Sequence, residues 1–159
     1  MRRSGVKIEV FKLGRLKQKA LALLIEDYFK RLSRIWAVSL IELKEKHSER
    51  QIEVPKSLQA SLESSFIVCL DECGHKLNSL EFAQVLQNWL DDSAIKKIVF
   101  VIGGAFGIPQ AILQRANYRM SFSDLTFTSD HAWLILWEQL YRASTIHAGT
   151  SYHHGDSQD

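Results

Sequence analysis

The order of apolar and polar residues divides the chain into alternating short and long segments. Short, nearly continuous apolar runs are typical of buried strands, whereas apolar residues three or four positions apart are typical of helices. The short runs predict strands at residues 6–11, 35–43, 66–70, 98–102 and 118–122. The longer segments predict helices around residues 21–32, 57–64, 79–90, 109–116 and 132–146.

The first predicted helix shows the helical spacing most clearly. Its apolar residues form one stripe, made of Leu21, Leu24, Ile25, Tyr28, Phe29 and Leu32. Ser79 is the expected N-cap of a later helix, and Pro109 suits the first turn of another. Residues 44–56 are mostly polar and charged, so we expect an exposed loop there.

The alternation of strands and helices predicts an α/β fold with a mostly parallel sheet flanked by helices. No repeat or linker divides the sequence, and residues 1–159 are expected to form a single domain. Ligands of such sheets bind beyond the carboxyl ends of the strands. The segments after Leu70, Ile102 and Phe122 are therefore the places to look for a functional site.

A glycine-rich segment follows the predicted strand at 98–102. It reads Gly103-Gly104-Ala105-Phe106-Gly107. Glycines allow close backbone approach, so a ligand here would meet N–H and C=O groups. The pattern is neither the dinucleotide G-x-G-x-x-G nor a phosphate loop. On its own it fits a structural tight turn as well as a ligand site.

Two further strand ends carry polar residues. One is Leu70-Asp71-Glu72-Cys73-Gly74, and the other is Phe122-Ser123-Asp124-Leu125-Thr126-Phe127. Asp71 and Glu72 could hold a ribose or an amino group, or they could simply be solvated.

Composition indicates an ordinary globular protein, with 46% hydrophobic and 24% charged residues. No apolar run reaches the ~18 residues of a membrane span. The N-terminus lacks an apolar stretch like that of a secretory signal, so a cytoplasmic location and no membrane partner are expected. Cys69 and Cys73 form no redox or zinc pair, and Cys69 is expected to be a buried small hydrophobe.

The net charge of +2 says little, but its distribution is uneven. In residues 1–20 only Glu9 opposes a group of cations: Arg2, Arg3, Lys7, Lys12, Arg15, Lys17 and Lys19. This excess suits a polyanion such as RNA, or it forms a solvated face. The histidines show no metal-binding spacing, so no metal is expected.

Four segments in the second half of the chain resemble a known family. They read Phe100-Val101-Ile102-Gly103-Gly104-x-x-Gly107, Leu113-Gln114-Arg115-x-Asn117-Tyr118, Ser121-Phe122-Ser123-x-Leu125-Thr126-Phe127 and Glu138-Gln139-Leu140-Tyr141-Arg142-Ala143. In this order and spacing they resemble the ribosomal RNA large subunit methyltransferase H family, a SPOUT-type group. In the first half, Glu26-Asp27-Tyr28-Phe29-Lys30-Arg31-Leu32 is similar, whereas residues 44–56 match poorly.

The resemblance implies a SPOUT-type α/β knot with a C-terminal trefoil knot. It also implies an enzyme that uses S-adenosylmethionine to methylate N3 of a pseudouridine in 23S rRNA on the assembled ribosome. A homodimer is implied too, in which the last helix packs against a second subunit through Leu134, Trp137, Leu140 and Tyr141.

The resemblance also implies the site residues. Those implied to bind the cofactor are Leu70, Gly103, Gly104, Gly107, Phe122, Ser123, Asp124, Leu125, Thr126 and Phe127. Those implied to act in catalysis or RNA binding are Tyr152, His153 and Arg142. His153 is the candidate proton acceptor, because the ordinary pKa of histidine lies in the right range.

The chain departs from the family pattern near its last helix. Thr128 and Ser129 replace a usual Pro-His pair, Trp133 replaces an arginine, and His154 replaces a terminal basic residue. These departures support an alternative, a non-catalytic ribosome- or RNA-binding protein that keeps the knot fold.

Overall fold

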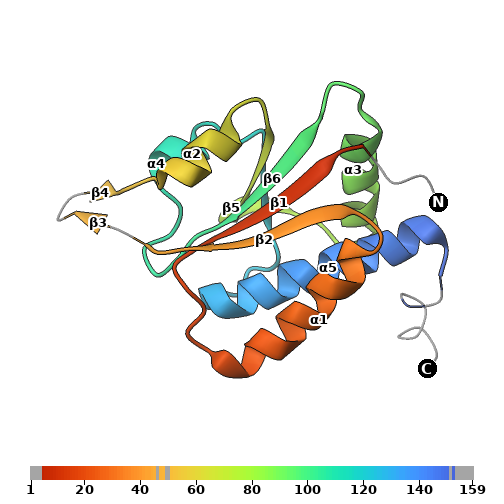
Figure 1. Ribbon diagram of the computed structural model, residues 1–159, viewed down its shortest axis with the longest axis horizontal. Coiled ribbons are helices and arrows are strands. Elements are labelled where there is room, and N and C mark those ends of the chain that lie inside the picture. Colours follow the sequence, from red (N-terminus) through yellow and green to blue (C-terminus); the bar gives the residue numbers. More distant parts are fainter. Residues whose placement is uncertain (1–4, 46, 49–50, 151, 153–159) are drawn as a thin grey trace.

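The computed structural model describes residues 5–45, 47–48, 51–150 and 152 (Figure 1). The strands are β1 (Lys7–Leu13), β2 (Ala37–Leu43), β3 (His47–Ser48), β4 (Gln51–Ile52), β5 (Phe66–Lys76), β6 (Lys97–Ile102) and β7 (Tyr118–Ser121). The helices are the short 3₁₀ turn η1 (Lys19–Leu21), α1 (Ala22–Ser33), α2 (Lys56–Leu62), α3 (Ser79–Asp91), α4 (Gln110–Leu113) and α5 (Ser129–Ala148).

Five strands form one sheet in the order β2-β1-β6-β5-β7, and every neighbouring pair is parallel. Parallel strands need crossover connections, and here helices supply most of them. The predicted fold class, a parallel sheet flanked by helices, is therefore confirmed. Among the described residues no helix is both long and apolar enough to cross a lipid bilayer.

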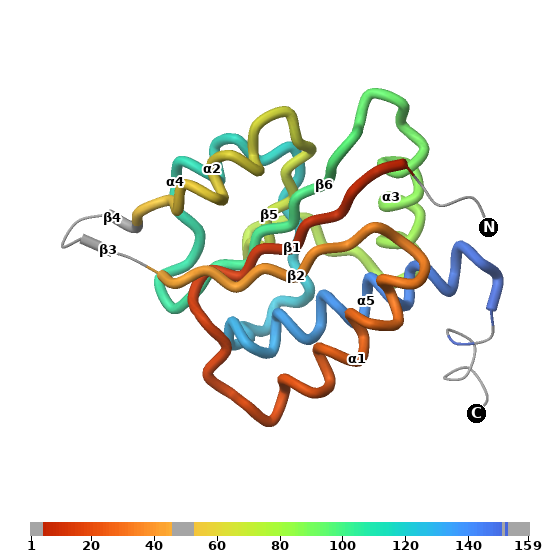
Figure 2. Tube along the Cα trace, viewed as in Figure 1, coloured from red at the N-terminus to blue at the C-terminus, as the bar shows by residue number. Residues whose placement is uncertain are grey.

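Helices cover both faces of the sheet, as Figures 1 and 2 show. Ile98, Phe100 and Ile102 of β6 point to the core beneath α1, α3 and α5, whereas Val99 and Val101 join the core beneath α2 and α4. All five side chains are almost fully buried. A strand that is covered on both faces needs apolar residues at every position, which explains its unbroken apolar run.

Three helical details differ from the sequence prediction. The N-cap of α3 is Asn78 and not Ser79: the Asn78 side chain accepts from the N–H of Glu81, whose carboxylate accepts from the N–H of Asn78. This reciprocal box uses two otherwise unpaired backbone donors. Helix α4 has one turn only, because Asn117 already bonds Ile67 and leads the chain into β7. Helix α5 begins at Ser129, three residues before the predicted start.

The segments predicted as loops contain additional strand structure. Residues 44–56 include the short antiparallel pair β3–β4. Strand β5 continues past Leu70 to Lys76, with a register shift in which Leu70 and His75 both pair with Met120 of β7. The intervening residues therefore bulge out of the ladder. A Cβ atom at Gly74 would lie 2.6 Å from the backbone nitrogen of Met120, so the end of the bulge requires glycine.

Candidate functional site

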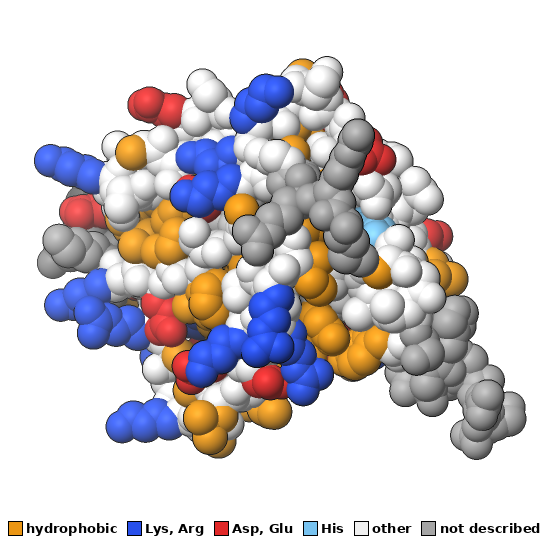
Figure 3. Space-filling model, turned by 45° about the vertical axis from the view of Figure 1, so that its right-hand side comes forward, with side chains coloured by type: hydrophobic (Ala, Val, Ile, Leu, Met, Phe, Trp, Pro, Cys, Tyr) orange, Lys and Arg blue, Asp and Glu red, His pale blue; other side chains and the backbone are white. Residues whose placement is uncertain are grey.

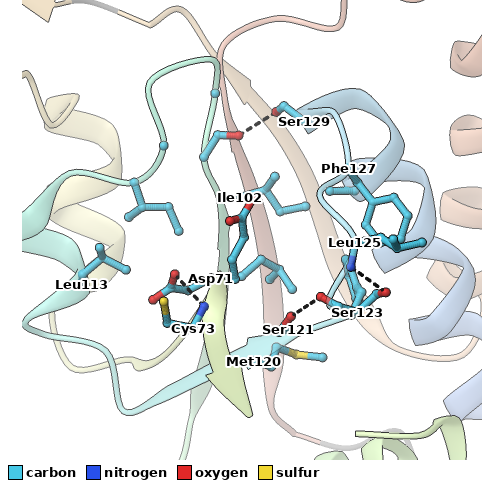
Figure 4. Close-up of a pocket in the computed structure, with 18 residues that line it drawn as sticks. Asp71, Cys73, Ile102, Leu113, Met120, Ser121, Ser123, Leu125, Phe127 and Ser129 are labelled. Atoms are coloured by element: carbon cyan, nitrogen blue, oxygen red, sulfur yellow. Dashed lines mark hydrogen bonds between the residues drawn. The ribbon is translucent and has the colours of Figure 1, made fainter. Parts of the chain in front are cut away.

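A cavity of about 330 Å³ opens at the carboxyl ends of β5, β6 and β7 (Figure 4). This is the edge that the sequence predicted, and the volume lies in the range of small-ligand sites. Its lining consists of Leu70, Asp71, Glu72, Cys73, Ile102, Gly103, Gly104, Gly107, Ile108, Leu113, Met120, Ser121, Phe122, Ser123, Leu125, Phe127, Ser129 and Ala132.

The glycine-rich segment after β6 forms one wall of this cavity. The N–H of Gly107 donates to the carbonyl of Gly104 at 3.1 Å, and Gly107 has a φ of 79°. A Cβ atom at Gly103 would lie 2.6 Å from the backbone of Gly107, and one at Gly104 would lie 2.6 Å from the Leu13 carbonyl. The wall is therefore bare backbone because no side chain fits there.

The bulge of β5 forms the acidic wall. Asp71 accepts a hydrogen bond from the N–H of Cys73 at 3.3 Å, and its other oxygen lies 3.5 Å from the guanidinium of Arg119. Glu72 lines the same wall. Because Arg119 partly neutralises Asp71, Glu72 supplies most of the negative charge that this wall offers to a ligand with positive charge.

The turn after β7 forms the third wall. The hydroxyl of Ser121 donates to the Ser123 carbonyl at 2.9 Å, and the Ser123 hydroxyl accepts from the N–H of Leu125 at 3.0 Å. The predicted cofactor-binding residues all line the cavity except Asp124 and Thr126. Asp124 is exposed and instead forms an ion pair with Lys76.

The start of α5 forms the remaining wall of the cavity and carries three of the departures from the family pattern, Thr128, Ser129 and Trp133. The Ser129 hydroxyl donates to the Gly103 carbonyl at 2.6 Å, and the Thr128 side chain caps the helix by accepting from the N–H of His131. Trp133 is fully buried and packs edge-on against Trp137, with ring centroids 5.8 Å apart. These residues thus hold the wall in place and leave the cavity open.

Several lining residues were not among the predicted cofactor-binding residues: Asp71, Glu72, Cys73, Ile102, Ile108, Leu113, Met120, Ser121, Ser129 and Ala132. The strand-end pattern had singled out Asp71 and Glu72 as residues that hold a ribose or an amino group, or that are simply solvated. Leu113 and Met120 look like ordinary core residues in the sequence, and only the folding of α4 and β7 over the cavity shows their place. Leu113 does open one of the family-like segments, but no sequence signal marks Met120.

Two of the predicted catalytic residues, Arg142 and Tyr152, lie together near the other end of α5. The guanidinium of Arg142 lies 5.0 Å from the ring centroid of Tyr152 and is 2.9 Å from the Glu138 carboxylate. Burial, a hydrogen bond with Tyr28 and the Glu138 charge raise the pKa of Tyr152 above its ordinary value. Tyr152 therefore keeps its proton at neutral pH. His153, the predicted proton acceptor, lies outside the described residues.

The cavity and the Tyr152 cluster are far apart within one chain. Ser129 lines the cavity at the start of α5, and Arg142 lies near its end. At about 1.5 Å per residue the helix separates the two residues by roughly 20 Å. Within one chain, Arg142 and Tyr152 therefore lie away from the cavity.

The two cysteines have different environments. Burial raises the pKa of the Cys69 thiol to about 12, which makes it unreactive at neutral pH. This agrees with the prediction of a buried hydrophobe. Cys73 is exposed on the acidic wall of the cavity. Within the described ranges no three His, Cys, Asp or Glu side chains gather where they could hold a metal ion.

A parallel sheet with a backbone-lined cavity at its carboxyl edge defines an α/β protein that binds a small ligand. A family model described as "Predicted SPOUT methyltransferase" matches residues 6–153. A protein from Thermodesulfovibrio yellowstonii named ribosomal RNA large subunit methyltransferase H is 39% identical, over 93% of this chain and 99% of that protein. The chain belongs to the SPOUT methyltransferases, and within them to the ribosomal RNA large subunit methyltransferase H family.

Solved structures support the same fold. A probable methyltransferase from Bordetella pertussis matches with a TM-score of 0.60 at 9% identity, covering 89% of this chain and 96% of that one. The SpoU methyltransferase AviRb from Streptomyces viridochromogenes, solved with the cofactor AdoMet, matches with a TM-score of 0.51 at 12% identity. That match covers 89% of this chain and 58% of AviRb. At these identities the likeness concerns the fold.

The tight glycine wall gives a first prediction. Gly103→Ala should lower the free energy of unfolding by about 1–3 kcal/mol, because the new methyl group would collide with the backbone of Gly107. Gly5→Ala is the matched control, because no atom lies within 4 Å of its added Cβ, and it should change stability by less than about 0.5 kcal/mol. Urea unfolding measures both. Equal stabilities for the two variants would contradict the packing described here.

Proposed function

We propose that the protein transfers a methyl group from S-adenosylmethionine to N3 of a pseudouridine in 23S rRNA on the assembled ribosome. Two observations support this proposal. One is the cavity at the carboxyl edge of the sheet, and the other is membership of a family whose named relatives are ribosomal RNA methyltransferases. The proposal includes a cytoplasmic location, one domain over residues 1–159 and a C-terminal trefoil knot.

The residues of the cavity fit S-adenosylmethionine. The bare backbone beside Gly103 and Gly104 offers hydrogen-bonding groups to an adenine edge, and Leu70 and Leu113 offer apolar surface to its ring. Glu72, and to a smaller extent the Arg119-paired Asp71, place negative charge near a ligand that carries an ammonium and a sulfonium. When bound, this cofactor supplies an electrophilic methyl group.

The chain's task is then alignment and proton removal. Holding two reactants in line can contribute ~7–11 kcal/mol to lowering a barrier. The imide proton of the base has to leave, and His153 is our candidate acceptor. Tyr152 remains protonated and its hydroxyl donates to Glu138 at 3.4 Å, so its role is to stack on or orient the base, while the Arg142 guanidinium lies over its ring.

The separation along α5 supports a homodimer in which the partner's tail completes the site. Trp137 and Leu140 were predicted to face that partner, but both are fully buried within one chain, and Trp137 packs against Phe29. Leu134 and Tyr141 are only partly buried and remain available. We therefore propose a contact through the outer side of α5 that brings Tyr152 and His153 to the cavity of the other subunit.

The alternative of a non-catalytic RNA-binding protein rested on Ser129, Trp133 and His154. Ser129 bonds the glycine wall and Trp133 is buried in the core, so neither obstructs the cavity. His154 lies outside the described residues. An open cavity is compatible with both the enzyme and this alternative, and methyl transfer distinguishes the two.

The direct test is transfer of labelled methyl from S-adenosylmethionine to ribosomes that lack this modification. We expect label at a pseudouridine of 23S rRNA with ribosomes as substrate and little with naked RNA. His153→Ala should reduce turnover and leave cofactor affinity unchanged. If the protein binds the cofactor tightly but transfers no label, the catalytic proposal is wrong.

Cofactor binding can be read from the two thiols. Cys73 should react with a thiol reagent and Cys69 should not, because only Cys73 is exposed. At ten times its Kd, S-adenosylmethionine should slow labelling of Cys73 about tenfold if it covers this wall. Cys73→Ser identifies the reacting thiol. Labelling at an unchanged rate, with the cofactor demonstrably bound, would place the cofactor elsewhere.

Completion of the site by the partner can be tested with mixed dimers. One subunit carries Gly103→Ala to impair the cavity, and the other carries the double change Tyr152→Phe and His153→Ala. Random mixing should restore about a quarter of the wild-type rate, because half of the dimers have one intact site. If each chain used its own tail, mixing would restore nothing.

A further inference from the structure

The segment between β1 and η1 carries three exposed cations. We call residues 15–19 the basic loop, and its cations are Arg15, Lys17 and Lys19. Leu16 between them packs toward the core beneath α1 and α5. None of the three cations forms an ion pair with a described residue.

The cations of α1 differ in this respect. Lys30 and Arg31 each pair with a carboxylate one turn earlier, at 2.9 Å. In Figure 3, Lys and Arg side chains lie beside Asp and Glu side chains on the lower part of the molecule. Since a neighbouring carboxylate neutralises most of a cation's field, the unpaired basic loop is better suited to an external anion than α1 is.

The backbone of the basic loop is held by two carboxylates from other elements. The N–H of Leu16 donates to Glu42 of β2 at 2.9 Å. The N–H groups of Lys17 and Gln18 both donate to Oδ2 of Asp130 on α5, at 2.9 and 2.8 Å. Three consecutive backbone N–H groups are thus fixed. A loop that is already held in place loses less conformational entropy when it binds a ligand.

Asp130 is itself buried, and both of its carboxylate oxygens have partners. Its other oxygen, Oδ1, lies 3.3 Å from the ammonium of Lys12, which is buried and also donates to the Gly14 carbonyl at 2.8 Å. Burial alone would raise the pKa of Asp130, but the amides of Gln18 and Lys17 and the Lys12 charge outweigh it and lower the pKa. Asp130 therefore stays ionised. Lys12, one of the cations counted in the sequence, is unavailable to RNA.

The same turn of α5 fixes the loop relative to the cavity. Ser129, the residue before Asp130, lines the cavity and bonds the Gly103 carbonyl. Adjacent Cα atoms are about 3.8 Å apart, so one helical turn joins the basic loop to the cavity wall. The loop and the cavity are therefore held as one rigid unit.

We infer that the basic loop binds backbone phosphates of the RNA beside the target nucleotide, and that Asp130 with Lys12 is the positioning pair that holds the loop at the cavity. The inference rests on the proposed function and adds to it the surface that the RNA contacts. Phosphates match a row of unpaired cations, and such contacts fix the register of an enzyme on nucleic acid.

The test is binding to ribosomes that lack the modification, measured as Kd against salt concentration. The loop variant carries Arg15→Gln, Lys17→Gln and Lys19→Gln. Its Kd at low salt should rise about tenfold or more, and the log–log salt slope should fall by about 2 to 3, since each phosphate contact contributes roughly 0.7–0.9. The matched control removes three other exposed cations, through Arg34→Gln, Lys56→Gln and Lys96→Gln, and should leave the slope nearly unchanged.

The positioning pair is tested with Lys12→Met combined with Asp130→Asn, which removes both buried charges together. All three loop cations remain, yet the salt slope should fall by about 1 or more, because the loop is no longer held at the cavity. A purely structural role would lower the melting temperature without changing the slope of the folded protein. An unchanged slope in this variant would overturn the role of Asp130.

The outcomes separate this inference from the function on which it rests. If the loop variant and the control bind alike, the basic loop is not the RNA surface, even when the wild type transfers methyl groups. If the wild type binds ribosomes with the expected slopes but transfers none, the catalytic proposal fails and the loop assignment stands. The loop variant changes only exposed side chains, so it gives an answer even if the paired variant does not fold.

Discussion

The buried ion pair between Lys12 and Asp130 is the contact on which the arrangement of the site depends. It joins the end of β1, which lies between β2 and β6 in the sheet, to the first turn of α5, which comes more than a hundred residues later. The neighbouring Ser129 extends this contact to the glycine wall through the Gly103 carbonyl. Three segments that are distant in sequence thus meet at one helical turn.

Burying two charges is costly, and removing one partner from such a pair typically destabilises a protein by about 3–5 kcal/mol. Here the cost is offset by further hydrogen bonds: Asp130 accepts two backbone N–H groups and Lys12 donates to a carbonyl. Every charged atom of the pair has a partner. The pair therefore defines one geometry for the loop, the helix and the cavity wall, instead of merely adding to stability.

The fold class and the position of the cavity could be predicted from the sequence. Apolar runs such as Ile98–Ile102 predict strands covered on both sides, and the alternation with helices predicts a parallel sheet whose carboxyl edge binds ligands. The glycines after β6 could be recognised as a tight turn or a ligand site because the reason for them is local. Only residues without a side chain permit the close backbone contacts observed there. The order and spacing of four motifs in the second half of the chain already indicated the family.

Other features depend on contacts between distant residues, which periodicity does not describe. Asn78, not Ser79, caps α3, since the cap depends on the reach of Glu81. Trp137 and Leu140 belong to the core of one chain, because α1 and the sheet already cover that side of α5. Lys12 is buried only because Asp130 neutralises it. Local patterns along the chain were enough to predict the strands, the helices and the edge of the sheet that carries the site. Which charges face solvent follows from the fold, because burial and pairing arise only when segments distant in sequence pack together.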